Sequence, residues 1–241
     1  MINKVSIYDD EIGSVDYVQH MGTDLTIVNS ARVSFGQEKE SLDLKDRKLI
    51  NYLVKHKHTS TFEHNVVTFR FKVPLFVRSQ HHRHRTWSFN EISRRYTDIN
   101  MEFHEPTLFR TQHSSNRQAS NTDELIDPPL YPEEESRYLS LVSCSEAVKV
   151  HHKVSLSLYQ ELIKAGVCRE QARGVLSQNL YTEYYGTVNL NNLLKFIDLR
   201  IHEGAQWEIQ QVAKACLKIA YELWPLAVGS YRTKEFKEQT S

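Results

Sequence analysis

The segment QHHRHRTWSFNEISRRY, residues 80–96, gathers more hydrogen-bonding side chains than any other stretch of this 241-residue chain. Five of the eighteen residues from 78 to 95 are arginines, and Glu91 is the single acid among them, so four positive charges are left over. Arginine forms two parallel, charge-assisted hydrogen bonds with a phosphate group and keeps its charge at working pH. The segment therefore predicts a binding surface for a phosphorylated ligand.

Apolar periodicity on both sides of this segment predicts alternating strands and helices. In VVTFRFKV, residues 66–73, every second side chain is apolar, which is typical of a strand with one buried face. Residues 83–96 are predicted as an irregular connection at the edge of a sheet, leading into another strand. Further strands are predicted at 5–21 and 180–188, and helices at 24–31, 43–56, 75–82, 137–165, 169–176, 190–202 and 205–224, with Asn189 capping the sixth helix and Pro225 ending the seventh.

The length and composition favour one globular domain over residues 1–241. Residues 107–135 are polar and lack apolar periodicity, so we interpret them as a surface excursion and not as a linker between two domains. Thirty basic and thirty acidic side chains cancel, which removes any overall field toward nucleic acid or an anionic membrane. We expect a cytoplasmic protein, because neither a signal-peptide core nor a run of about 18 apolar residues is present.

Several catalytic motifs are missing from the sequence. Cys144, Cys168 and Cys216 are too scattered for a disulfide framework or a Cys-x-x-Cys metal site, and none lies near the arginine cluster. Glycine-rich phosphate loops and the G-x-S-x-G elbow do not occur. The histidines could ligate a metal, but the neighbouring arginines disfavour a cation, and we expect no metal site. A nucleic-acid-binding module using the basic patch 78–95 stays as an alternative function.

Residues 83–96, RHRTWSFNEISRRY, fit the pattern RHRxxSxNxxSxRY at every specified position. That pattern is the signature of the flavin-dependent thymidylate synthases, and the chain resembles this family over most of its length. The other matching segments are ARVSF at 31–35, HTSTFEH at 58–64, NLYT at 179–182, TVN at 187–189, DLR at 198–200 and AQWEIQQ at 205–211.

The resemblance implies reductive methylation of dUMP to dTMP, with methylenetetrahydrofolate as carbon donor and FAD reduced by NADPH as hydride source. It also implies a homotetramer whose active sites are shared between subunits. We expect an α/β protein of the α+β type, in which helices flank a central, mostly antiparallel sheet and additional long helices are present.

The resemblance also assigns residues to the two ligands. Arg200 is the expected catalytic residue, because a fixed positive charge against the uracil edge stabilises an anion at N3. Ser60 replaces the family's usual threonine and keeps its hydroxyl, whereas Lys195 and Gly204 replace flavin-contacting asparagine and histidine, so we assign them no contact. Flavin contacts are assigned to His58, Ser60, Arg83, His84, Arg85, Glu91, Asn189 and Asn191, and dUMP contacts to Gln80, Arg83, Glu91, Ser93, Arg94, Arg95, Arg173 and Arg200.

Overall fold

The computed structural model describes residues 2–130 and 142–238. Its centre is a five-stranded antiparallel sheet in the order β1-β2-β3-β9-β4. This arrangement confirms the expected α+β class with a central antiparallel sheet. The strands of this sheet are β1 (Lys4–Ser6), β2 (Ser14–Met21), β3 (Val66–Pro74), β4 (Ser88–Glu91) and β9 (Tyr181–Asn189).

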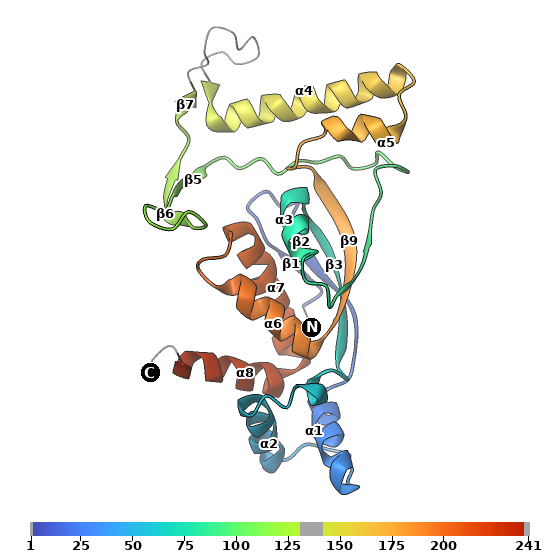
Figure 1. The fold of residues 1–241 in the computed structure, drawn as a ribbon, viewed down its shortest axis with the longest axis vertical. Helices are drawn as coiled ribbons and strands as arrows, with labels where there is room; N and C mark the ends of the chain where they lie inside the picture. The colour runs from blue at the N-terminus through green and yellow to red at the C-terminus, as the bar shows by residue number, and fades with distance from the viewer. Residues whose placement is uncertain (1, 131–141, 239–241) are drawn as a thin grey trace.

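The helices occupy three regions around the sheet (Figure 1). The helices α3, α6 and α7 lie beside the sheet, α1, α2 and α8 gather at one end of the molecule, and α4 and α5 lie across the other end. Their bounds are α1 (Asp24–Arg32), α2 (Leu44–Lys55), α3 (Leu75–His81), α4 (Cys144–Lys164), α5 (Arg169–Ala172), α6 (Leu190–Ile201), α7 (Trp207–Leu223) and α8 (Pro225–Glu238), with 3-10 turns at Val33–Phe35, Thr59–Phe62 and Arg173–Val175.

The core forms between one face of the sheet and the apolar sides of α6 and α7. Alternation places Phe69 and Phe71 of β3 wholly inside, as the sequence predicted. On the neighbouring strand Gly186 is required, because a Cβ there would lie 2.8 Å from the Phe71 ring and 3.2 Å from Trp87. This close approach lets the segment that precedes β4 pack directly on the sheet.

The predicted helix starts and ends largely hold. The side chain of Asn189 accepts a hydrogen bond from the Asn192 amide at 2.9 Å, which caps α6 as expected. Helix α4 ends before Gly166, whose φ of +87° suits glycine. Its start differs from the prediction, because residues 142 and 143 form a short strand, β8 (Val142–Ser143), and α4 begins at Cys144. Residues 137–141 of the predicted helix lie outside the described residues.

The segment 83–96 differs from its prediction in one respect. It is an edge segment, as expected, but it contributes its own strand, β4, which pairs antiparallel with β9. The strand was missed because Ser88, Asn90 and Glu91 have low strand propensity. Pairing with β9 and burial of the neighbouring Trp87 outweigh that propensity.

The described part of the excursion at 107–135 contains strands that the sequence analysis did not predict. It contains β5 (Phe109–Gln112) and β6 (Ser120–Ile126), which form a hairpin, and β7 (Pro129–Leu130), which pairs with β8. Polar contacts hold the hairpin: Asn121 donates to Thr111 Oγ1 at 2.9 Å, for example. Apolar periodicity could not reveal strands stabilised in this way, and residues 131–135 lie outside the described residues.

The chain also continues as a helix where a stop was expected. Pro225 ends α7 as predicted but opens α8, a position where its missing N–H costs nothing. The carboxylate of Asp24 accepts hydrogen bonds from the amides of Leu226 and Ala227 at 2.9 and 3.0 Å. This cap comes from about two hundred residues away in the sequence.

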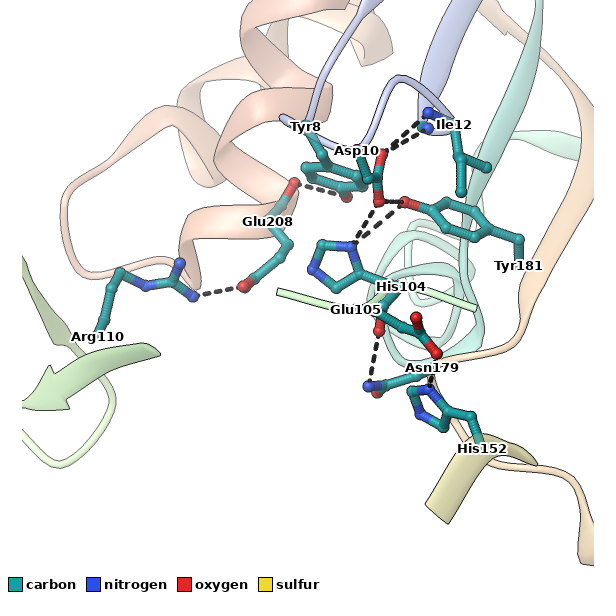
Figure 2. Close-up of polar contacts among 11 residues, drawn as sticks. Tyr8, Asp10, Ile12, His104, Glu105, Arg110, His152, Asn179, Tyr181 and Glu208 are labelled. Atoms are coloured by element: carbon teal, nitrogen blue, oxygen red, sulfur yellow. Dashed lines mark hydrogen bonds and ion pairs between the residues drawn. The ribbon is translucent and has the colours of Figure 1, made fainter. Parts of the chain in front are cut away.

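A polar network fastens the N-terminal loop to the connection that follows β4 (Figure 2). Asp10 accepts hydrogen bonds from His104, from the hydroxyl of Tyr181, and from the amides of Ile12 and Gly13. Burial opposes ionisation of this carboxyl group, but the four hydrogen bonds outweigh it and hold its pKa well below the usual range. The ionised Asp10 thereby fixes where the chain leaves the sheet edge toward the excursion.

Candidate active site

The turn between α3 and β4 is anchored by a buried histidine. His81 lies in an aromatic cage with ring centroids 4.5 Å from Trp87 and 4.6 Å from Phe196, and its Nδ1 shares a 2.8 Å hydrogen bond with the Tyr184 hydroxyl. Burial, followed by the nearby positive groups, holds the pKa of His81 well below the ordinary value. His81 is therefore a neutral core residue, and it fixes the exposed residues that follow it in the chain.

His84 and Arg200 meet where α6 reaches this turn. The Nε of Arg200 donates to His84 Nε2 at 3.0 Å. Burial and the charge of Arg200 lower the pKa of His84 to about 4, so the imidazole is neutral near pH 7. Since Nε2 accepts from arginine, the ring proton must reside on Nδ1. The contact orients Arg200 and leaves an imidazole N–H available as a donor.

A cavity of about 540 Å³ lies between α3, β4, β9 and α5. At its wall Arg78 Nε forms a 3.1 Å ion pair with Glu91 Oε1, and Thr182 donates to the same oxygen at 2.7 Å. Within the described residues the other oxygen, Oε2, has no partner and can accept from a ligand. The polar residues that line this cavity are Arg78, Glu91, Ser93, Arg94, Glu170, Arg173, Gln178 and Thr182.

The cavity's other arginines have different surroundings. Arg94 is half-buried and donates to the carbonyls of Ile99 and Asn100 at 2.6 and 3.2 Å, so it shapes the connection after β4. Burial lowers the pKa of Arg94. Arg173 is exposed and has no ion pair or hydrogen bond of its side chain to any described residue. Among the described residues it is the free cation of the cavity wall.

The structure divides the residues assigned to dUMP. Glu91, Ser93, Arg94 and Arg173 line one cavity, whereas Gln80 is directed to the far side of α3. Residues 78 and 80 are about 200° apart around a helix, which explains the division. Arg200 donates to the backbone carbonyl of Gln80 at 3.4 Å, and the Gln80 side chain points to the far side of α3. Arg83 and Arg95 are exposed outside the cavity.

The residues assigned to flavin also form two groups. Asn189, Asn191, His58 and Ser60 lie around the start of α6, where Asn191 donates to Glu63 at 2.7 Å. The segment 83–85 lies beside the end of α6, about 14 Å further along the helix. Neither the Arg83 nor the Arg85 side chain has a partner among the described residues. Glu91 lies apart from both groups, in the cavity beside β4.

Aromatic side chains and cysteines in the described parts of the chain differ in how far they are buried. Trp87, Tyr181 and Tyr184 are core residues, whereas the side chain of Tyr185 is exposed. None of the three cysteines lines the cavity at β4, and burial strongly raises the pKa of the Cys216 thiol. Residues 2–130 and 142–238 contain no group of three side chains placed to hold a metal ion and no helix suited to cross a membrane.

Sequence reasoning missed two kinds of site residue. Arg78 was counted in the basic cluster but given no role, because its pairing with Glu91 depends on how α3 packs beside β4. Thr182 lies on a predicted strand, and no local signal marks its hydroxyl as a partner for a residue ninety-one positions away. A helical-wheel plot of 75–81, which separates Arg78 from Gln80, was the available hint.

Comparison with known proteins places this geometry in a family. Residues 16–226 match the family described as thymidylate synthase complementing protein. The chain belongs to the flavin-dependent thymidylate synthase family. It is 42% identical to the flavin-dependent thymidylate synthase of Thermotoga neapolitana over 236 residues, covering 97% of this chain and 96% of the relative.

Two further proteins support the assignment of this chain to the flavin-dependent thymidylate synthase family. The flavin-dependent thymidylate synthase of Thermus thermophilus is 42% identical over 222 residues, which cover 91% of this chain and 75% of that protein. Among solved structures, the UMP/dUMP methylase PolB from Streptomyces cacaoi, bound with 5-Br dUMP, aligns with a TM-score of 0.74 at 30% identity. That alignment covers 91% of this chain and 94% of PolB.

Proposed function

We propose that this protein is a cytoplasmic, single-domain enzyme that methylates dUMP reductively to dTMP. The observation that carries the proposal is the cavity beside β4, where the segment 83–96 contributes Glu91, Ser93 and Arg94 and the 3-10 turn after α5 contributes the unpaired Arg173. Such a cavity offers a cation for a phosphate and both donors and acceptors for a sugar or base. A nucleoside monophosphate needs these groups together.

Each polar residue of the cavity has a specific role in this proposal. Arg173 binds the phosphate, since its guanidinium has no other partner among the described residues. Arg94 already donates to three backbone carbonyls, so it positions the cavity wall. Glu91 accepts from the substrate through Oε2, while Arg78 and Thr182 keep its carboxylate in place.

The turn at 83–85 is suited to a flavin diphosphate. Arg83 and Arg85 present exposed guanidinium groups, and neutral His84 presents Nδ1–H between them. FAD, reduced by NADPH, would supply the hydride, and methylenetetrahydrofolate would supply the carbon. The absence of a cysteine from the cavity at β4 agrees with this proposal, because the described residues of that wall offer no thiolate to activate the uracil ring.

Arg200 is proposed as the catalytic residue. Its Nε is bound to His84, so the remaining guanidinium N–H groups are held in one orientation. A fixed cation beside the uracil edge lowers the pKa of N3–H by stabilising the anion. His84 is neutral and therefore does not compete for that negative charge.

Sharing of sites between subunits explains the division of the assigned residues. Gln80 and Arg200 lie on one side of α3 and the cavity at Glu91 on the other. If one nucleotide contacts both groups, neighbouring protomers must each contribute one of them. We therefore propose that the segment 80–96 forms a wall between two sites, in the homotetramer that the family resemblance implies.

The proposal is tested with the purified protein. We expect a flavin band at about 450 nm, NADPH oxidation, and release of tritium from [5-³H]dUMP that requires methylenetetrahydrofolate. The Arg200→Ala variant should lose at least about 100-fold in tritium release while retaining FAD. A Lys214→Ala variant, which changes an exposed residue on α7, is the matched control. Protein that binds neither FAD nor dUMP would contradict the proposal.

A further inference from the structure

A chain of side-chain hydrogen bonds connects the signature segment with the excursion hairpin. Gln80 on α3 donates through Nε2 to Gln206 Oε1 at the start of α7. Gln206 donates in turn to Glu208 Oε2 at 2.9 Å, and Arg110 of β5 donates to the other oxygen of Glu208. Figure 2 shows the last of these contacts. Residues remote in sequence thus form one continuous polar row.

The chemistry at the end of this row determines its direction. The Glu208 carboxylate is paired with Arg110 and can only accept hydrogen bonds. Gln206 must therefore turn its NH2 group toward Glu208, which leaves its carbonyl oxygen to face Gln80. Gln80 must then offer its NH2 group to Gln206. The side-chain oxygen of Gln80, Oε1, has no partner among the described residues and is left for a ligand.

The end of the row is rigidly held. Glu208 is only 6% exposed, and the guanidinium of Arg110 lies over the Trp207 ring at 4.8 Å. Arg110 also donates through Nε to Ser120 Oγ at 3.0 Å on the paired strand β6. The Tyr8 hydroxyl donates to the backbone carbonyl of Glu208 at 3.2 Å, which holds the main chain at this position. The carboxylate itself is held by Arg110 on one oxygen and by Gln206 on the other, so the direction of the row stays constant.

We propose that Gln206, Glu208 and Arg110 are positioning residues that hold the Gln80 amide with its carbonyl oxygen toward the substrate. This rests on the proposed function, in which Gln80 contacts dUMP. The row makes Gln80 selective for a hydrogen-bond donor of the nucleotide. In dUMP the available donors are the 3′-hydroxyl and, before the uracil ring ionises, its N3–H. The excursion thereby contributes to substrate recognition through Arg110, without touching the substrate.

A Glu208→Gln substitution reverses the row without changing its shape. Arg110 keeps the oxygen of the new amide, so the NH2 group faces Gln206 and both following glutamines flip. Gln80 then presents NH2 to a nucleotide group that is itself a donor. We expect the Kd for dUMP to rise about 3- to 10-fold, with FAD retained. The midpoint of urea unfolding identifies any loss of folded protein.

A double-mutant cycle separates positioning from general structure. Glu208→Gln should raise the Kd for dUMP in the wild-type background and have no further effect in a Gln80→Leu background, because the residue through which it acts is gone. Equal effects in both backgrounds would overturn the inference while leaving the proposed function intact. Wild-type protein that does not bind dUMP would overturn both.

Two further comparisons complete the experiment. Arg110→Met should weaken dUMP binding in the same direction, whereas Arg117→Met, which removes an exposed arginine from the same hairpin, should not. N3-methyl-dUMP and 2′,3′-dideoxyuridine monophosphate each lack one of the two donors. The analogue lacking the donor that Gln80 recognises should bind wild type and Glu208→Gln equally. If Glu208→Gln weakens both analogues as much as dUMP, the inference is wrong.

Discussion

Asp10 provides a stringent test of how the sheet edge is attached to the excursion. In an Asp10→Ala variant four donors lose their acceptor. Each donor loses about 1 kcal/mol, because the side chains of His104 and Tyr181 and the residue Gly13 are buried and Ile12 is partly buried. The free energy of unfolding should fall by about 4 kcal/mol, or ~8–16 °C in Tm for a chain of this length.

Urea unfolding at fixed protein concentration measures this loss. Asp9→Ala is the matched control, because Asp9 is exposed and makes no hydrogen bond or ion pair with the described residues, so its effect should stay within about 0.5 kcal/mol. Because the pKa of Asp10 is held low in the folded state, its stabilisation is complete above the unfolded pKa of about 3.8 and is lost as the pH falls further. A loss below about 1 kcal/mol at pH 7 would refute the reasoning.

Other perturbations test separate parts of the structure. The pKa of His84 is about 4 in the folded protein and about 6.5 in the unfolded chain, so the free energy of unfolding decreases as the pH falls from the higher to the lower value. The His84→Gln variant should therefore lose less stability than the wild type between pH 7 and 5. An equal loss in both proteins would contradict this. Alanine at Cys144, Cys168 and Cys216 together should preserve most of the tritium release, whereas complete loss in a folded variant would point to a thiol nucleophile. Gly186→Ala places a methyl group 2.8 Å from an aromatic ring and should cost about 1–3 kcal/mol in urea unfolding; an unchanged midpoint would mean that the strands move apart.

Local patterns predicted most of the secondary structure because the responsible interactions are local. Alternation in 66–73 reports one buried face of a strand, and Asn189 caps the helix that it begins. Local patterns did not predict the excursion hairpin, since polar cross-strand bonds such as Asn121 to Thr111 replace apolar alternation. They did not predict strand β4 either, because its pairing partner lies about a hundred residues away.

The candidate site could be predicted as a set of residues but not as a geometry. The family resemblance assigned Glu91, Ser93 and Arg94 to dUMP, and these residues do line one cavity. The resemblance could not reveal that Gln80 faces away from this cavity, or that Arg78 pairs with Glu91. These facts follow from the rotation of α3 and its packing beside β4, which depend on contacts across the fold.

The sequence by itself determined the family of this protein, the order of most of its helices and strands, and the dense group of binding side chains at residues 80–96. Only the tertiary structure decided how these side chains are divided. Arg78 and Gln80, which are neighbours in the sequence, lie on opposite sides of α3. Gln80 contacts Gln206 at the start of α7, and Glu208 of α7 contacts Arg110 of β5. The physical reason is that hydrogen-bond direction and charge pairing depend on which groups meet in space, and a sequence pattern records only which groups are present.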